Sequence, residues 1–152
     1  MCHWLATAST VLGIYFGITI FFLFTFYYHN NHAGTWGLFS AVFASICLHL
    51  RLLRGNNRLG GWYTIGQLNS LAAFGFICFC IALGFTSWYI IYAAYHNIPM
   101  LPVTSSFYLA AVWAGMTAKW SFCCFILSYQ YSRFLRYSTP FLVIQEETSE
   151  TA

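Results

Sequence analysis

The sequence predicts an all-α membrane protein with four transmembrane helices and both termini in the cytoplasm. Its 152 residues are 60% hydrophobic and only 6% charged, with a mean hydropathy of +0.66. A soluble domain carries about a quarter charged residues, so the soluble, disordered and fibrous classes are excluded. Four apolar stretches are long enough to cross a bilayer, which takes about 20 helical residues. The net charge of +3 comes from too few residues to form a basic patch, so no nucleic-acid partner is expected.

The four spans follow one another with short polar breaks. The first ends in an aromatic run and contains Gly13 and Gly17, a GxxxG pattern that packs helices closely either within one chain or between copies. An arginine-rich turn follows the second span. The third is longer than a straight crossing needs and ends at a loop with two prolines. The predicted spans lie at about residues 8–28, 36–53, 63–92 and 105–131, within one bundle of residues 1–137 followed by a short cytoplasmic tail, 138–152.

The arginines set the predicted orientation. Arg51, Arg54 and Arg58 flank the second loop, and Arg133 and Arg136 follow the fourth span. The first and third loops contain neither lysine nor arginine. By the positive-inside rule, the second loop, the tail and the N-terminus face the cytoplasm, and the other two loops face the exterior or a lumen.

With this orientation, the histidines lie at different predicted depths in the membrane. His29, His32 and His96 belong to the outer loops, where a single histidine can simply be a solvated polar residue. His49 lies within the second span. An ionisable group inside a membrane is a functional candidate by default, and the structural alternative for His49 is an interhelical hydrogen bond.

Lys119 lies near the middle of the fourth span, where we expect it to be buried. The three acidic residues of the sequence all follow position 145, so no carboxylate of the chain lies in the membrane. Lys119 is therefore expected to contact backbone carbonyls, tyrosine hydroxyls or water, to lose its proton, or to bind an anion from outside the chain. The last case predicts an acidic ligand or an acidic partner subunit.

The aromatic content points to a flat ligand. Sixteen Phe, eleven Tyr and six Trp exceed what interface belts need, and aromatic walls pack well against a conjugated molecule. Heme fits the combined pattern, because its iron accepts His or Tyr and its propionates pair with Lys or Arg. Lys119 or Arg51 is the predicted propionate partner. The candidate iron ligands are His49, His96, His29 and His32.

Three motifs of the fourth span carry a family resemblance: Ser106-Phe107-Tyr108-Leu109, Val112-Trp113 and Lys119-Trp120-Ser121-Phe122. They resemble the Ser-aromatic-Tyr-Leu, Val-Trp and Lys-Trp-x-Phe pattern of the heme-responsive-gene family of four-span heme transporters, in the same order and spacing. His49 is similar to the family's second-span histidine or tyrosine, and His96 to its outer-loop histidine.

The resemblance implies import of heme into the cytoplasm from the exterior or an endolysosomal lumen, across a plasma, endosomal or lysosomal membrane. It implies transfer from His96 to His49 and then to a tail motif, which is here the short Phe134-Leu135-Arg136-Tyr137. Heme is then the transported substrate and no permanent cofactor is predicted. We expect a homo-oligomer in the lipid bilayer, because four spans of this size enclose little volume. The remaining predicted heme-binding residues are Tyr108, Trp113, Arg133, Phe134, Arg136 and Tyr137.

Two other functions remain as alternatives. An accessory or scaffold subunit would use Lys119 to pair with an acidic residue of a partner. A b-type heme oxidoreductase needs two histidines at matched depth, whereas only His49 lies within a predicted span. Hydrolytic chemistry lacks a membrane Asp or Glu to act as acid or base. The sequence therefore predicts a transporter, with no catalytic residues, rather than an enzyme.

Overall fold

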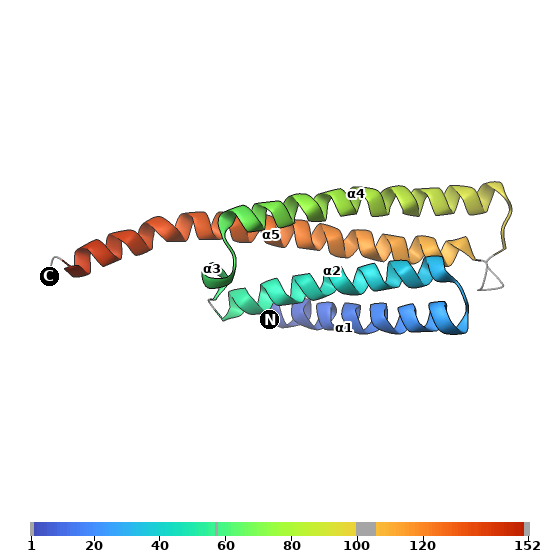
Figure 1. Ribbon diagram of the computed structural model, residues 1–152, viewed down its shortest axis with the longest axis horizontal. Helices are drawn as coiled ribbons and strands as arrows, with labels where there is room; N and C mark the ends of the chain where they lie inside the picture. The colour runs from blue at the N-terminus through green and yellow to red at the C-terminus, as the bar shows by residue number, and fades with distance from the viewer. Residues whose placement is uncertain (1, 57, 100–105, 151–152) are drawn as a thin grey trace.

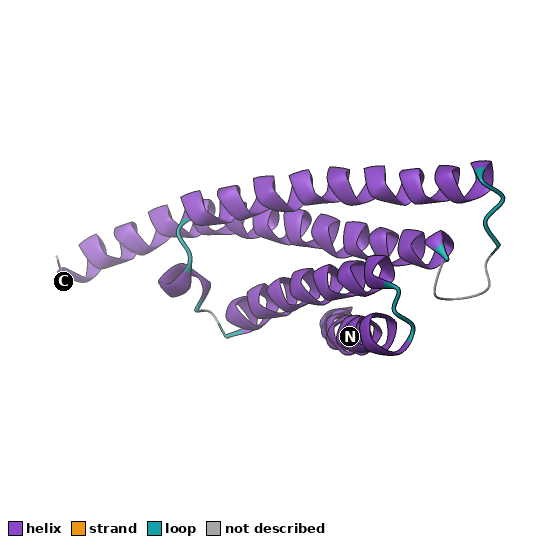
Figure 2. Cartoon of the chain, turned by 45° about the vertical axis from the view of Figure 1, so that its right-hand side comes forward, coloured by secondary structure: helices purple, strands orange, loops and turns teal. Residues whose placement is uncertain are grey.

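The computed structural model describes the backbone of residues 2–56, 58–99 and 106–150 and the side chains of residues 4–56, 58–99 and 106–137. Within these residues the chain is helical and contains no strand (Figure 2). Four of the helices are long and apolar enough to span a membrane, so the prediction of an all-α protein with four membrane-spanning helices is confirmed. In chain order the elements are α1 (Cys2–Phe22), the π-helical η1 (Leu23–Tyr27), α2 (Asn31–Gly55), α3 (Leu59–Trp62), α4 (Ile65–Tyr95) and α5 (Phe107–Glu150).

Most helix ends lie outside the predicted spans. The helix α2 starts at Asn31, so His32, which we predicted in an outer loop, belongs to the first helical turn. The reason is Asn30, whose side chain caps the helix by accepting from the Ala33 N–H at 3.2 Å. The helix α5 continues to Glu150 and so includes most of the predicted tail, in a segment without a glycine that could cap an earlier end.

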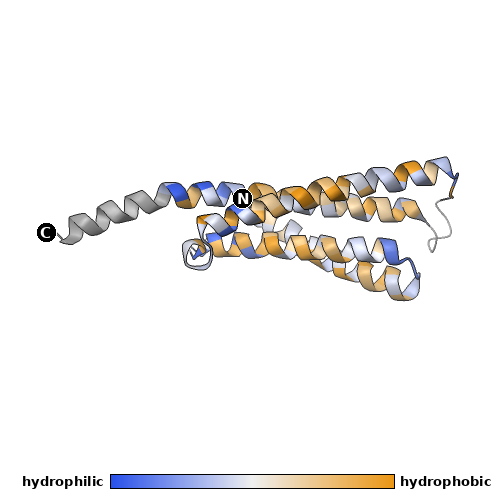
Figure 3. Ribbon diagram, turned by 45° about the horizontal axis from the view of Figure 1, so that its top comes forward, coloured by the Kyte–Doolittle hydropathy of each residue, from blue (hydrophilic) through white to orange (hydrophobic). Residues whose placement is uncertain are grey.

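The long helices lie side by side in the order α4, α5, α2 and α1 (Figure 1). The turns after η1 and α4 form one end, the histidine end, which carries His29, His32 and His96. The opposite end carries α3, the last turn of α2 and the arginines near the end of the membrane part of α5, and is the arginine end. Hydrophilic residues gather near the two ends and hydrophobic ones between them (Figure 3).

Small residues let the two central helices approach their neighbours. Gly75 of α4 lies so close to α5 that an added Cβ would be 3.0 Å from the Phe125 backbone nitrogen. Thr117 Oγ1 donates to the Trp36 carbonyl of α2 at 2.8 Å. Close packing of this kind holds helices together in lipid, where no hydrophobic force drives them to associate. The buried small residues of α5 recur every three or four positions, at Ala110, Ala114, Thr117, Ser121, Cys124 and Ser128.

The GxxxG pattern of α1 packs within the chain. A Cβ added to Gly17 would lie 2.8 Å from the Gly37 carbonyl oxygen and 2.9 Å from the Ala41 Cβ, both of α2. Gly13 instead contacts the indole ring of Trp120, which reaches across from α5. Both glycines are therefore used for contacts between helices of one chain.

Candidate functional site

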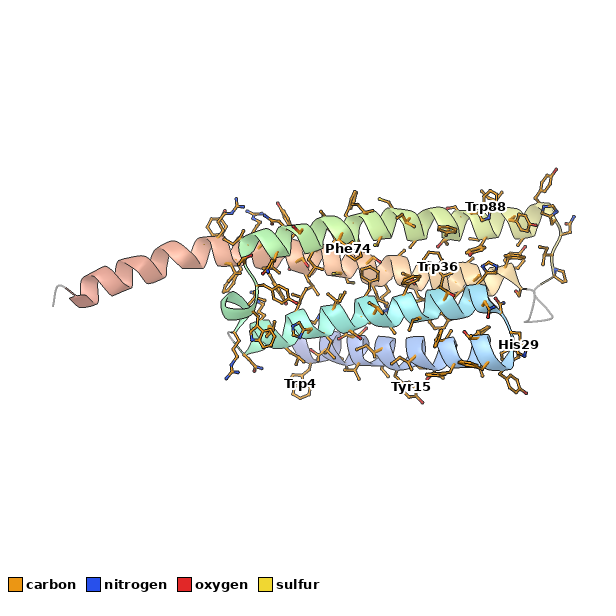
Figure 4. All side chains as sticks on the ribbon, viewed as in Figure 1. Trp4, Tyr15, His29, Trp36, Phe74 and Trp88 are labelled. Atoms are coloured by element: carbon orange, nitrogen blue, oxygen red, sulfur yellow. The ribbon has the colours of Figure 1, made fainter. Side chains whose placement is uncertain are left out.

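Two facing rows of side chains connect the ends of the molecule. We call the surface they form the α2–α4 face. The Trp36 and Phe85 ring centroids lie 5.3 Å apart. Those of Phe43 and Phe74 lie 6.0 Å apart. In Figure 4, Trp36 and Phe74 are both drawn over α5, between α2 and α4. The α2 row consists of His32, Trp36, Phe39, Phe43 and Ile46, and the α4 row of Phe74, Cys78, Ile81, Phe85 and Tyr89.

At the histidine end, the hydroxyl of Tyr89 connects two side chains of α2. Trp36 Nε1 donates to Tyr89 Oη at 3.3 Å. His32 Nδ1 also lies 3.3 Å from Tyr89 Oη. Tyr89 is buried, whereas His32 is exposed. One ring nitrogen of His32 is thus fixed by the hydroxyl, and its Nε2 remains available to a ligand when Nδ1 carries the proton.

His96 joins the same cluster from the other side. Its ring centroid lies 4.4 Å from that of Tyr92. Tyr92 lies 5.2 Å from Phe107, and Phe107 lies 5.8 Å from His32. These residues form the histidine-end cluster, which consists of His32, Trp36, Tyr89, Tyr92, His96 and Phe107.

His29 is not part of that cluster. It is exposed and has a φ of 52°, in the turn between η1 and α2. Figure 4 shows it at the edge of the molecule beside the end of α1, away from α4. Of the three outer histidines, the structure therefore brings together only His32 and His96.

His49 lies beside an open groove at the other end of the α2–α4 face. It is exposed, and its ring centroid lies 6.0 Å from that of Trp62 and 6.0 Å from that of Tyr63. Tyr63 is also part of the groove wall. The groove has a volume of about 650 Å³ and is lined by Ile46, Tyr63, Gly66, Gln67, Ser70, Leu71 and Phe74. Phe74 belongs to both the groove and the α4 row, so the groove continues the rows toward the arginine end.

The predicted tail residues divide between two surfaces. The guanidinium of Arg54 lies 4.5 Å from the ring centroid of Phe134 and 4.8 Å from that of Tyr131. The other predicted residues face α4 instead. Arg133, Arg136 and Tyr137 line a pocket of about 370 Å³ with Asn69, Tyr129 and Ser132. Residues 133–137 therefore do not form one continuous binding surface.

The expectation that Lys119 is buried is wrong. The side chain is exposed, and its Nζ lies 4.8 Å from the ring centroid of the buried Trp120. Consecutive residues of a helix differ by about 100° in direction, and the small-residue row of α5 faces α2 and α4 while Lys119 faces away. Arg51 is half-buried. The structure does not bring either cation to the His49 groove.

Two further predicted heme-binding residues lie outside the histidine-end cluster. Tyr108 and Trp113 are half-buried on α5, and neither ring contacts the histidine-end cluster among the described side chains. No group of three His, Cys, Asp or Glu side chains in the described part of the chain could hold a bare metal ion.

Sequence reasoning missed several aromatic residues of the site. One signal could have found half of them, because aromatic and histidine side chains recur every three or four residues at 85–96 and at 32–43. The missed residues are Trp36, Tyr89, Tyr92, Phe107, Trp62 and Tyr63.

Comparison with known proteins supports the resemblance. The chain is 28% identical over 134 residues to the protein named Heme transporter hrg-1 of Caenorhabditis elegans. The match covers 86% of this chain and 69% of that relative. No protein-family model and no solved structure matches the chain. The similarity to the four-span heme transporters, predicted from the motifs of the fourth span, is confirmed, and it points to a transporter and not to an enzyme.

Proposed function

We propose that this protein carries heme across a membrane, from the histidine end to the arginine end along the α2–α4 face. The observation that carries the proposal is the pair of facing rows between the histidine-end cluster and the His49 groove. Aromatic rows suit the flat apolar macrocycle, and imidazoles suit its iron. The relative named as a heme transporter supports heme as the substrate.

Capture takes place at the histidine-end cluster. His96 and His32 approach Phe107 from two sides, so either imidazole can meet the iron while the macrocycle lies against the aromatic rings. Binding through single axial ligands at separate positions suits transport, because the ligand must be able to leave each site.

His49 receives heme at the other end of the face. The neighbouring groove, at about 650 Å³, falls in the range of about 300–1,000 Å³ that small-molecule sites occupy. The pocket with Arg133 and Arg136 then offers guanidinium groups to the propionates.

The α2–α4 face is open on its outer side, so we expect a homo-oligomer in which a second copy covers the bound heme.

The proposed direction of heme transport follows from the positions of the arginines. The arginines lie at one end of the bundle, and the positive-inside rule assigns this end to the cytoplasm. Heme therefore enters from the exterior or from an endosomal or lysosomal lumen, which gives the protein a role in iron homeostasis.

Growth of a heme-deficient cell on limiting external heme tests the proposal. Cells expressing the protein should grow, and His49→Ala and His96→Ala should each reduce growth at equal protein levels. His29→Ala is the matched control, because His29 is a histidine of the same end that lies outside the cluster. If His49→Ala and His96→Ala both supported growth as well as the unmodified chain, the proposed transfer would be wrong.

A further inference from the structure

A second set of aromatic side chains lies on the side of α4 away from the α2–α4 face. Gly75 of α4 contacts α5, and Phe74 and Phe76 point to either side of it, each about 100° around the helix. Phe74 belongs to the α2–α4 face, whereas the ring centroid of Phe76 lies 5.5 Å from that of Phe125 on α5. We call this second surface the α4–α5 face, which consists of Phe76, Phe79, Phe122, Phe125 and Tyr129.

The α4–α5 face leads into the pocket of about 370 Å³ at the arginine end. Tyr129 belongs to both, because its ring stacks on that of Phe125 and also lines the pocket. Ser132 Oγ donates to Asn69 Oδ1 at 2.6 Å, so α4 and α5 are joined at the pocket wall. Since Asn69 Oδ1 accepts this bond, Asn69 Nδ2 is the amide atom that can donate to a ligand. We call this pocket the arginine pocket, lined by Asn69, Tyr129, Ser132, Arg133, Arg136 and Tyr137.

The membrane part of the chain holds no carboxylate that could pair with the arginine pocket. The first acidic residue of the sequence is Glu146. It follows Arg136 by ten positions, which is about 15 Å along the helix α5 at 1.5 Å per residue. A second copy in the same orientation has its own glutamates at the same distance along its helix. An anion that balances the two guanidinium groups therefore comes from another kind of molecule.

The dimensions of the α4–α5 face match one leaflet of a bilayer. The part of α5 that is apolar enough to span a membrane ends at Tyr137, so the arginine pocket lies at the edge of the hydrocarbon core. Phe122 precedes Arg133 by eleven positions, about 16 Å along the helix. Half of the hydrocarbon core is about 15 Å thick. Phe76 is 47% exposed and Phe122 is 39% exposed, so the rings can contact an acyl chain along this length.

We propose that the α4–α5 face binds an anionic phospholipid from the leaflet at the arginine end. Its phosphate occupies the arginine pocket, where the two guanidinium groups donate to the phosphate oxygens, and an acyl chain lies along the aromatic rings. Basic pockets between transmembrane helices on the cytoplasmic side bind such headgroups. Because the same pocket ends the proposed heme route, lipid and heme would occupy it in turn. The inference itself rests on the pocket and the rings and not on heme transport.

Native mass spectrometry of the purified protein without heme tests the proposal. The protein in detergent is mixed with phosphatidylinositol, phosphatidic acid or phosphatidylcholine of the same acyl chains, and the lipid retained per protomer is counted. We expect preferential retention of the two anionic lipids. Arg133→Met and Arg136→Met should each weaken it about fivefold, and the double variant about thirtyfold. Arg58→Met is the matched control, because it removes an exposed arginine of the same end outside the pocket.

The result that would overturn the proposal is equal retention of the anionic lipids by the double variant, or an equal loss in Arg58→Met. Glycerol 3-phosphate tests whether the pocket takes a free phosphate instead of a lipid. It should not displace the lipid at equal concentration, because it lacks the acyl chains that contact the rings. Full displacement would overturn the lipid assignment in favour of a soluble phosphate compound. No heme is present, so these outcomes are separate from success or failure of the heme-transport proposal.

Two further measurements test the aromatic part of the site and cover the case of an unstable variant. Phe76→Ala should weaken lipid retention about threefold, whereas Phe16→Ala, which removes a ring of similar exposure from α1, should not. Equal losses in the two variants would refute binding along the α4–α5 face. For the unmodified protein alone, phosphatidylinositol should raise the unfolding temperature more than phosphatidylcholine does. Equal shifts by the two lipids would refute the proposal without any variant.

Discussion

Replacing Tyr89 by Phe removes one hydroxyl and leaves the ring in place. The hydroxyl accepts from Trp36 Nε1 and contacts His32 Nδ1, each at 3.3 Å, the long end of the hydrogen-bond range. Hydrogen bonds between membrane helices are worth about 0.6 kcal/mol each on average, so Tyr89→Phe should cost about 1.2 kcal/mol. If all of this cost fell on heme binding through a less ordered His32, the dissociation constant would rise about eightfold.

Heme titration of the purified protein, followed by the Soret absorbance, measures this change. Tyr92→Phe is the matched control, because its ring contacts His96 and Phe107 while its hydroxyl makes no hydrogen bond to another described residue. The control should bind heme as the unmodified protein does. A Tyr89→Phe dissociation constant within twofold of the unmodified value, or an equal loss in Tyr92→Phe, would refute a positioning role for Tyr89.

Three other substitutions test the packing and the histidine assignment. Gly17→Ala places a Cβ 2.8 Å from a backbone oxygen of α2 and should destabilise the protein by about 1–3 kcal/mol in SDS unfolding, whereas Gly84→Ala meets nothing within 4 Å and should change little. Thr117→Val removes a bond between α5 and α2 and should cost about 0.6 kcal/mol, more than Thr86→Val, whose hydroxyl bonds within its own helix. His29→Ala should leave the heme dissociation constant unchanged in the Soret titration, and a weakening equal to that of His96→Ala would place His29 in the site.

Much of the fold could be predicted because it depends on composition. Apolar length fixed the number of membrane-spanning helices, and the arginines separated the two ends of the bundle. Helix ends were less predictable, since they depend on individual contacts. Asn30 starts α2 early by capping it, and the same side chain also donates to the Ser106 carbonyl at 3.2 Å, across 76 positions of the chain. Such a long-range contact leaves no local pattern in the sequence.

The direction in which the Lys119 side chain points from α5 could have been predicted from the sequence, but our prediction of a buried side chain was wrong. Its position in the middle of a span suggested burial, yet the face that α5 turns inward is indicated by its small residues. Ala118 and Ser121 are on that face, and Lys119 lies between them in sequence but about 100° away from Ala118 in direction. Trp120 is the residue after Lys119, so it is also about 100° away from Lys119 in direction, on the side opposite Ala118. From there its ring reaches Gly13 of α1.

The separation of histidines and cations onto different faces has a consequence for binding strength. In the proposed route, a heme with its iron on an imidazole of the α2–α4 face and a propionate on Lys119 would have to reach around α5, because Lys119 faces away from the small-residue row that α5 turns toward α2 and α4. A site with both interactions would bind heme tightly and release it slowly. Imidazole and aromatic contacts alone give weaker binding at each step, and the guanidinium groups are met only in the pocket at the arginine end. On the proposed route no single position would hold both the iron and the propionates, so each binding step stays weak enough for heme to leave.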